Sequence, residues 1–248
     1  MKVSVIIPVL NERDCLPENL AALKLQEWIN EIVVVDGGST DGTLPWLRQQ
    51  SGIKVIESAP GRGIQLNAGA RAATGDTLVF LHADSRLPQG ARGRIQKALD
   101  IPLVAGGCFY VRFDSRRPRS LAIVRIGINL RTALTHSATG DQAIFVRASV
   151  FEQLGGFREW PLFEDVDFVN WMKRLGRLAV IRSPVTVSAR RHVRYGAFRT
   201  VMLVYMLRLG FWAGISPFTL ASWYQAKNGS SKPHGIHVAA AERRVISS

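Results

Sequence analysis

The sequence predicts an α/β fold with a mostly parallel central sheet. Runs of β-branched and apolar residues without polar alternation are typical of strands buried on both faces, and they occur at residues 3–7, 31–35, 53–56 and 77–81. Helical patterns separate these runs at residues 16–25, 43–50 and 63–73. A strand–helix–strand order at this spacing is typical of parallel α/β units.

The second half of the chain is less regular. We expect helices at residues 90–99 and 120–135, strands at 104–113 and 143–146, and an apolar helix at 197–215. Together these patterns predict one main domain at residues 1–190, a basic, apolar helical extension at 191–226 and a flexible tail at 227–248.

The composition predicts an anionic partner and a reducing compartment. The net charge of +13 favours nucleic acid, a lipid headgroup surface or a phosphate-bearing substrate. No nucleic-acid module is recognised and the aromatic residues are not interleaved with basic ones, so we expect no nucleic acid. Two cysteines, Cys15 and Cys108, are too few for a disulfide framework. With no signal-peptide pattern at residues 3–10, a cytoplasmic protein is expected.

Polar residues follow three of the predicted strands. Asn11 and Glu12 follow the first, Asp36 ends the second and Asp84 follows the fourth. Ligands bind at the carboxyl ends of parallel strands, where Asp36 could accept hydrogen bonds from a base or ribose. Asp84 suits Mg²⁺ or Mn²⁺, which share oxygen ligands with substrate phosphates. The alternatives are a capped helix after residues 39–41 and an exposed turn at Asp84.

Two further segments carry charge that suits phosphate or proton chemistry. Arg62 begins the glycine-rich segment 61–69 before a helix, where it could neutralise a phosphate. Residues 162–168 place three carboxylates in an apolar heptapeptide, and the next acid is Glu242. Glu164 and Asp167 are three residues apart and share a helix face, whereas Asp165 points elsewhere. The alternative is that these acids only stabilise the first turn of a helix.

Six motifs in order resemble the family 2 glycosyltransferases with the GT-A fold, across roughly the first 190 residues. The motifs are PVLNE at 8–12, VVDGGSTDGT at 34–43, GRGIQLNAG at 61–69, FLHAD at 80–84, GDQ at 140–142 and FED at 163–165. The segment 80–88 also resembles a bacterial subgroup linked by gene context to arsenosugar or selenium-related pathways.

The resemblance implies a donor site for a nucleotide sugar. Its residues would be Asp36 at the base or ribose, Asp84 at the metal and the diphosphate, and around them Pro8, Asn11, Glu12, Gly38, Arg62 and Asn67. The family's Asp-x-Asp motif has His82 in place of its first aspartate here, which puts the strength of metal binding in question. His192 is a further candidate ligand of the metal, which would be Mg²⁺ or Mn²⁺.

The resemblance also implies inverting sugar transfer with Asp165 as the general base. Asp141, Gln142 and Glu164 would lie on the acceptor side, and the acceptor would be a small molecule or a lipid. Two alternatives stay open. A nucleotidyltransferase of similar fold would carry a glycine-rich loop after the first strand, which residues 8–13 lack. The second alternative is a non-catalytic basic protein that binds a membrane or nucleic acid, which the net charge of +13 alone supports.

The apolar segment 197–215 predicts peripheral contact with the inner face of a membrane. Its two arginines, Arg199 and Arg208, are nine residues apart and lie on opposite sides of an ideal helix. A spanning helix would carry that charge at high cost, so we expect a helix that covers the main domain. Arg190, Arg191 and Arg194 would then face anionic headgroups or substrate phosphate. A buried helix or a homo-oligomer contact is the alternative.

Overall fold

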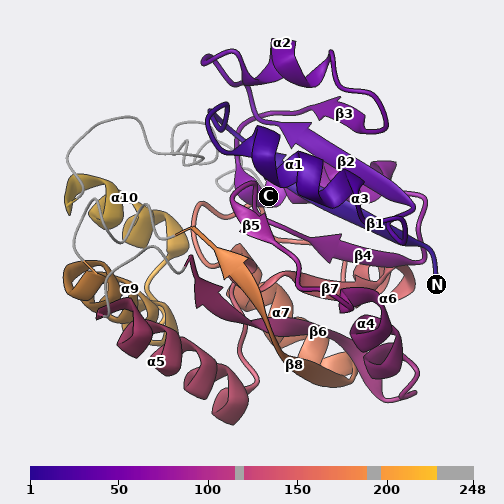
Figure 1. Ribbon diagram of the computed structural model, residues 1–248. Helices are drawn as coiled ribbons and strands as arrows, with labels where there is room; N and C mark the ends of the chain where they lie inside the picture. The colour runs from indigo at the N-terminus through magenta and orange to yellow at the C-terminus, as the bar shows by residue number, and fades with distance from the viewer. Residues whose placement is uncertain (115–119, 189–196, 228–248) are drawn as a thin grey trace, which may run out of the picture.

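The computed structural model describes residues 1–114, 120–188 and 197–227. Its centre is an eight-stranded sheet with the strand order β3-β2-β1-β4-β7-β6-β8-β5 (Figure 1). The strands are β1 (Val3–Val9), β2 (Glu31–Asp36), β3 (Lys54–Glu57), β4 (Thr77–Phe80), β5 (Ser85–Arg86), β6 (Val104–Phe113), β7 (Ile144–Arg147) and β8 (Arg177–Val187).

Six of the described helices follow the predicted ranges with small changes of boundary, whereas no range was predicted for the helices at 148–153, 164–175 and 217–227. The described helices are α1 (Leu16–Lys24), α2 (Thr43–Leu47), α3 (Arg62–Ala72), α4 (Ala91–Leu99), α5 (Ser120–Thr135), α6 (Ala148–Gln153), α7 (Glu164–Leu175), α9 (Ala197–Trp212) and α10 (Pro217–Lys227), with a 3₁₀ turn η1 (Gly140–Gln142). The pattern did not predict β8, because Arg182, Ser183 and Pro184 interrupt its apolar run. The predicted α/β fold is confirmed.

Two hydrophobic clusters show that the sheet is buried on both faces. Val5 and Ile7 of β1 belong to one cluster, with the apolar faces of α1 and α4. Ile6, between them, belongs to the other cluster, with residues of α3, α6 and α7. Because successive side chains of a strand point to opposite faces, the uninterrupted apolar runs of β1 and β2 are explained.

The parallel half of the sheet gathers the polar strand ends at one edge. β1 pairs in parallel with β2 and β4, and β2 pairs in parallel with β3. In this register Val9 lies opposite Asp36. Buried Gln65 of α3 fixes the two strand ends, because its amide donates to the carbonyls of Val9 at 2.8 Å and Val35 at 2.9 Å.

The second half of the chain joins the same sheet through antiparallel strands. β7 lies between β4 and β6 and is antiparallel to both, whereas β6 and β8 are parallel. Ile144 lies opposite Phe80, so the loop that precedes β7 meets the carboxyl end of β4. The mixed strand order thereby brings residues 136–143 beside the polar edge built by the first half.

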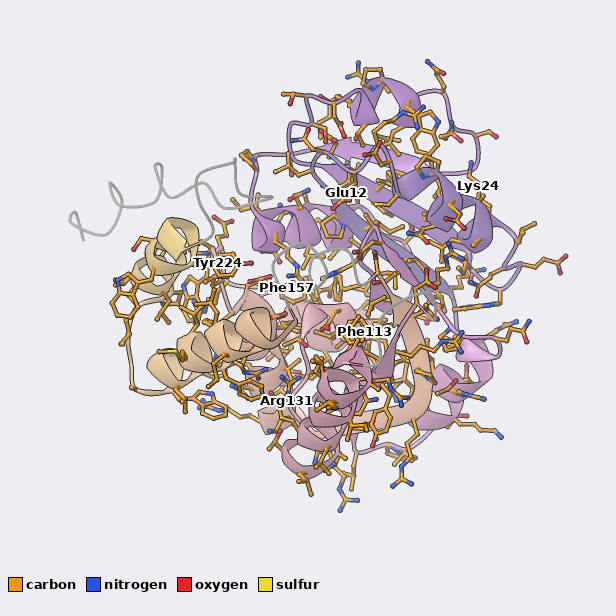
Figure 2. All side chains as sticks on the ribbon, turned by 60° about the vertical axis from the view of Figure 1, so that its left-hand side comes forward. Glu12, Lys24, Phe113, Arg131, Phe157 and Tyr224 are labelled. Atoms are coloured by element: carbon orange, nitrogen blue, oxygen red, sulfur yellow. The ribbon has the colours of Figure 1, made fainter. Side chains whose placement is uncertain are left out.

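α5, α9 and α10 lie together at one end of the molecule (Figure 1; Figure 2). They leave a surface of large apolar side chains exposed, which we call the apolar helix surface: Ile123, Ile126, Leu130 and Leu134 of α5, Met202, Val204, Tyr205, Met206, Leu209 and Trp212 of α9, and Trp223 of α10. Within the described residues, no helix is long and apolar enough to cross a membrane.

The contact between α3 and the segment before α7 depends on a glycine. A Cβ atom added to Gly63 would lie 2.3 Å from the carbonyl oxygen of Arg158, closer than real Cβ contacts. Nearby, the side-chain amide of Asn67 donates to the Phe157 carbonyl and accepts from the Phe157 N–H, both at 2.8 Å. Close backbone approach therefore sets the position of α3 relative to α7.

We predict that Gly63→Ala destabilises the protein by about 1–3 kcal/mol, because the added methyl group overpacks against backbone that cannot move alone. Gly93→Ala in α4 is the matched control, since nothing lies within 4 Å of its added Cβ. The control should be stabilised by roughly 0.5–1 kcal/mol. Urea denaturation measures both, and equal free energies of unfolding in the two variants would contradict the packing argument.

Candidate active site

Asp36 is the last residue of β2, at the polar edge of the sheet, and only one of its two carboxylate oxygens has a hydrogen-bond partner among the described residues. The residue is fully buried. Its Oδ1 accepts the N–H groups of Gly38 and Ser39, both at 2.9 Å. Its Oδ2 is buried and has no hydrogen-bond partner among the described residues. A buried acceptor without a partner costs free energy, so this oxygen is a candidate contact for a ligand that donates an N–H or O–H.

Hydrogen bonds join the loop after β1 to the loop after β2. Asn11, in a left-handed conformation with φ of 57°, donates its N–H to Ser39 Oγ and accepts the Thr40 N–H on its side chain. The N–H of Glu12 donates to Thr43 Oγ1 at 3.2 Å. Asn11 and Glu12 thus bond the segment that follows Asp36, and their contacts stabilise the two loops.

Three other predicted donor residues have different surroundings. Pro8 is half-buried in β1 and pairs with Val35, and Gly38 has open space where its Cβ would lie. Asn67 is buried and bonds the backbone of Phe157 in both directions. The structure therefore brings Pro8 and Gly38 to the Asp36 loop, but it does not place the Asn67 amide there.

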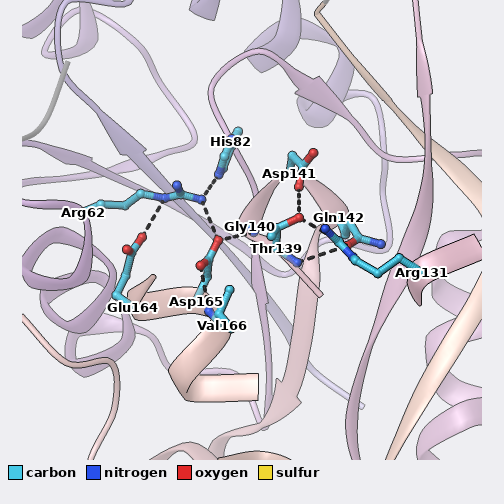
Figure 3. A network of polar contacts seen from close by, with 10 residues as sticks. All are labelled: Arg62, His82, Arg131, Thr139, Gly140, Asp141, Gln142, Glu164, Asp165 and Val166. Atoms are coloured by element: carbon cyan, nitrogen blue, oxygen red, sulfur yellow. Dashed lines mark hydrogen bonds and ion pairs between the residues drawn. The ribbon is translucent and has the colours of Figure 1, made fainter. Parts of the chain in front are cut away.

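Arg62 is the centre of the charged part of the site (Figure 3). Its Nε lies 3.3 Å from Glu164 Oε1 and its Nη2 lies 3.8 Å from Asp165 Oδ2. Nη2 also contacts His82 Nε2. Burial acts to lower the pKa of the guanidinium, but the neighbouring carboxylates of Glu164, Asp165, Asp141 and Asp84 raise it above its ordinary value. Arg62 therefore stays charged and connects α3 to α7 and β4.

Asp165 is a buried carboxylate at the start of α7. Its Oδ2 accepts the Gly140 N–H at 2.6 Å and its Oδ1 accepts the Val166 N–H at 2.7 Å. The helix N-terminus also favours negative charge at this position. The carboxylate is held in place by backbone groups from two separate segments, which leaves it oriented towards Arg62 and the loop before β7.

Phe163, which precedes Glu164, adopts a left-handed conformation with φ of 66°. Its ring packs against Phe211 of α9, with ring centroids 5.0 Å apart. For a bulky residue this backbone conformation is strained and persists only where the surroundings impose it. α9 therefore helps to fix the beginning of α7, where the carboxylates lie.

The sequence places Glu164 and Asp167 on one helix face, and the ion pairs of the three carboxylates divide differently. Glu164 and Asp165 both reach Arg62, whereas Asp167 lies 3.9 Å from Arg158. The difference arises because Asp165 is drawn towards the Gly140 N–H at the first turn. Burial raises the pKa of Glu164 to about 7, with Arg62 opposing this effect and Asp165 adding to it.

His82 and Asp84 follow β4, as predicted. The Arg62 guanidinium donates to His82 Nε2, which puts the ring proton of a neutral His82 on Nδ1. Asp84 is half-buried and no hydrogen bond or ion pair is found for it within the described residues. No group of three His, Cys, Asp or Glu residues that could hold a metal occurs in residues 1–114, 120–188 and 197–227. His192 lies outside these residues, as do Arg190, Arg191 and Arg194.

Asp141 and Gln142 have different parts in the loop before β7. Gln142 is fully buried and its amide donates to the Phe109 carbonyl at 3.0 Å. Its Oε1 accepts the Thr139 N–H at 3.0 Å and Arg131 Nη2 at 3.2 Å. Asp141 accepts the Thr139 hydroxyl and is half-buried. Gln142 is therefore part of the loop's framework, and Asp141 is the more accessible of the two.

Arg131 and Arg208 were not among the predicted site residues, and for Gly140, the first residue of the GDQ motif, no contact with Asp165 was predicted. Gly140 contributes a backbone N–H, which no residue type can signal. Arg208 was considered only as a charge on an apolar helix, yet it is buried and donates to Ser137 Oγ at 2.9 Å. An arginine inside an otherwise apolar helix was the available signal.

A separate surface hollow of about 680 Å³ lies at the carboxyl ends of α5 and α7. It is lined by nine residues, among which His136, Lys173, Arg174 and Arg177 are basic and none is acidic. Because it lacks a carboxylate and is not formed by the polar strand ends, it is not part of the candidate active site.

The family and the fold match known proteins. The family model for glycosyl transferase family 2 matches residues 4–155, so the chain belongs to this family. The structure is similar to the mannosyltransferase PcManGT of Pyrobaculum calidifontis in complex with GDP-Man and Mn²⁺, with a TM-score of 0.63, 23% identity and coverage of 94% of this chain and 66% of that one. The fold is that of the GT-A glycosyltransferases.

Other similar proteins extend the comparison. Residues 1–349 of S. aureus TarS in complex with UDP-GlcNAc match with a TM-score of 0.61 and 21% identity over 76% of this chain and 58% of that one. The undecaprenyl-phosphate 4-deoxy-4-formamido-L-arabinose transferase of Edwardsiella ictaluri is 30% identical over 83% of this chain and 66% of its own length. An uncharacterised glycosyltransferase of Mycobacterium bovis is 34% identical over 98 residues, 40% of this chain and 44% of its length. The chain thus spans less than two thirds of several proteins that it matches.

The raised pKa of Glu164 predicts a pH-dependent stability. Because the folded state holds the proton more tightly than the unfolded state, the contribution of Glu164 to stability is greatest below about pH 4.5 and falls as the pH rises to about 7. Glu164→Gln resembles the protonated form and should remove this loss. As the pH rises from about 4.5 to about 7, the free energy of unfolding of the variant should increase by about 1–3 kcal/mol relative to that of the original protein.

Urea denaturation of both proteins at several pH values from 4.5 to 8 measures this difference, since all other titrating groups are common to the two. If the two free energies of unfolding differed by the same amount at every pH, the raised pKa of Glu164 would be contradicted.

Proposed function

We propose that the chain transfers a sugar from a nucleotide-diphosphate donor to an acceptor hydroxyl with inversion, with Asp165 as the general base. One observation carries the proposal: a buried carboxylate from α7 converges with Arg62, His82 and Asp141 at the carboxyl ends of the parallel strands. Membership of family 2 supports sugar transfer and favours it over nucleotidyl transfer or non-catalytic binding. The two complexes with UDP-GlcNAc and GDP-Man support a nucleotide-sugar donor.

Asp36 would hold the nucleoside of the donor. Its buried Oδ2 is an acceptor without a partner in the described chain, and a base N–H or ribose hydroxyl would satisfy it. Asn11, Glu12, Pro8 and Gly38 would shape the surrounding wall. From there the diphosphate would extend towards Arg62, whose guanidinium is suited to phosphate oxygens.

A divalent metal, Mg²⁺ or Mn²⁺, would be held by Asp84 together with the donor diphosphate. The half-buried Asp84 carboxylate has the chemistry for this, and a metal that keeps waters and phosphate ligands needs only one or two protein carboxylates. His82 offers no second carboxylate and its Nε2 is already bonded to Arg62. The metal would neutralise charge on the leaving diphosphate, with His192 as a further candidate ligand.

The proposed reaction is a single displacement. Asp165 removes the proton from the acceptor hydroxyl, the oxygen forms a bond to the anomeric carbon, and the bond to the diphosphate breaks with its electron pair on the leaving group. Gly140 and Val166 hold Asp165 in place by their N–H groups. Glu164 and Asp141 border the acceptor side, and Arg62 provides positive charge between base and leaving group.

We predict that Asp165→Asn lowers turnover by roughly 10²–10⁴-fold, the usual contribution of a general base, while nucleotide binding persists. Nucleotide release from UDP- and GDP-sugars, with Mn²⁺ or with a chelator, measures turnover, and thermal shift with UDP or GDP measures binding. Asp167→Asn is the matched control, because Asp167 is on the same helix but pairs with Arg158. Turnover of Asp165→Asn equal to that of the control would remove Asp165 from the mechanism.

We further propose that the apolar helix surface contacts an anionic membrane at its inner face. The described parts of α5, α9 and α10 carry no acidic residue, and α5 contributes the exposed Arg125. A surface that combines apolar side chains with positive charge fits anionic headgroups. The undecaprenyl-phosphate relative supports a lipid acceptor. α9 is therefore proposed as a membrane-facing part of a helical extension, with residues 1–190 as the catalytic domain.

Liposome flotation tests this surface. Binding to vesicles that contain anionic lipid should fall at least roughly tenfold in the double variant Met206→Gln and Leu209→Gln, because each substitution removes an exposed apolar contact with the membrane. The control is Leu103→Gln, an exposed leucine outside the three helices. Equal flotation of all three proteins, or binding that depends on dimer formation instead, would count against membrane contact.

A further inference from the structure

Two arginines beside the active site have donors without partners. Arg208 of α9 is 3% exposed; its Nη2 donates to Ser137 Oγ, but its Nε and Nη1 are buried without a hydrogen-bond partner in the described residues. Arg131 of α5 donates from Nη2 to Gln142 Oε1, and its Nε is likewise buried and unpaired. Three guanidinium nitrogens therefore have no acceptor within residues 1–114, 120–188 and 197–227.

The two guanidinium groups belong to one small region. Arg208 binds Ser137 and Arg131 binds Gln142, and both of these residues are bonded to Thr132 of α5: its hydroxyl donates to the Ser137 carbonyl at 3.2 Å and accepts the Gln142 amide at 3.0 Å. Burial lowers the pKa of Arg208 to about 10, and the charge of Arg131 adds to this effect. The buried Arg208 beside the charge of the half-buried Arg131, with three buried donor nitrogens that have no partner among the described residues, is costly unless an anion supplies acceptors.

This pair and Arg62 lie on different sides of Asp165. Arg131 and Arg208 donate hydrogen bonds to residues 142 and 137 of one loop, and Gly140 of that loop donates its N–H to Asp165. Arg62 lies on the other side of Asp165 (Figure 3). The base therefore lies between two cationic centres. Because Arg62 is proposed to meet the donor diphosphate, the second centre is available to the acceptor.

We propose that Arg131 and Arg208 bind a phosphate group of the acceptor, and that the acceptor is a phosphate monoester that also carries a hydroxyl. This inference rests on the proposed sugar transfer. A dianionic phosphate balances both charges, and its oxygens can accept from the three unpaired nitrogens, which suits the planar fork of arginine. The phosphate then positions the acceptor, and its hydroxyl faces Asp165.

Isothermal titration calorimetry of the full chain tests the site with two hydroxyl-bearing esters, glycerol 3-phosphate and 1-octanoyl-glycerol 3-phosphate. Arg131→Gln and Arg208→Gln should each weaken binding roughly 10- to 100-fold, because each removes a charged hydrogen-bond donor. Arg125→Gln, an exposed arginine of the same α5, is the matched control and should change nothing. Tighter binding of the octanoyl ester would identify a lipid-borne phosphate, and equal binding a small polar acceptor.

A second variant separates loss of the site from loss of the fold. Arg208→Met replaces a buried, unpaired cation with an apolar side chain of similar length, so it should melt at or above the temperature of the original protein. Glycerol 3-phosphate should raise the melting temperature of the original protein but not that of Arg208→Met. UDP and GDP binding should be the same in both, since Arg208 is on the acceptor side.

Affinities that are unchanged in the arginine variants would overturn the inference. So would inorganic phosphate binding as tightly as both esters, because the site would then show no preference for an acceptor. If the protein instead failed to bind UDP or GDP, the proposed sugar transfer would fail, while ester binding would still report on Arg131 and Arg208. The two failures are therefore distinguishable.

Discussion

The contact of Arg62 with Glu164 and Asp165 holds the site together. Arg62 begins α3 in the first half of the chain, and the two carboxylates begin α7 in the second half. Neither half has a complete site alone. The glycine at position 63 and the bonds between Asn67 and Phe157 bring the two helices close enough for the ion pairs to form. The charged centre is therefore a consequence of close backbone packing.

The same region concentrates features that are costly in a purely structural role. A strained Phe163, a glutamate with a raised pKa and three buried guanidinium nitrogens without a partner among the described residues lie around the loop before β7 and the start of α7. The buried Asp36 Oδ2, at the end of β2, also lacks a partner among the described residues. Each cost is of the kind that a bound ligand offsets. Arg62 lies on one side of Asp165, and Arg131 and Arg208 bond the loop on its other side.

The sequence predicted the regular first half of the fold well, because buried parallel strands have a clear signature. The roles of Asp36, Arg62, Asp84, Asp141 and Asp165 stay predictions. The partners of these residues were not predictable from the sequence. Asp165 accepts the N–H of Gly140, 25 residues away, and both Glu164 and Asp165 contact Arg62 of α3. Such contacts depend on strand order and tertiary packing, and the spacing of residues along one helix does not determine either. The sequence shows Arg208 only as a charge within an apolar helix. Its hydrogen-bond partner, Ser137, is 71 residues away, so the contact could not be predicted from the helix alone. The narrower subgroup resemblance stays a prediction.

The most direct test of the central claim is the anomeric configuration of the first sugar released when the protein hydrolyses an α-linked nucleotide sugar, with water in place of the acceptor. Proton NMR follows the product before mutarotation. Because one displacement opposite the leaving diphosphate inverts the anomeric carbon, the account predicts that the β anomer appears first, and that Asp165→Asn releases it far more slowly. An α anomer as the first product would contradict single displacement at this site.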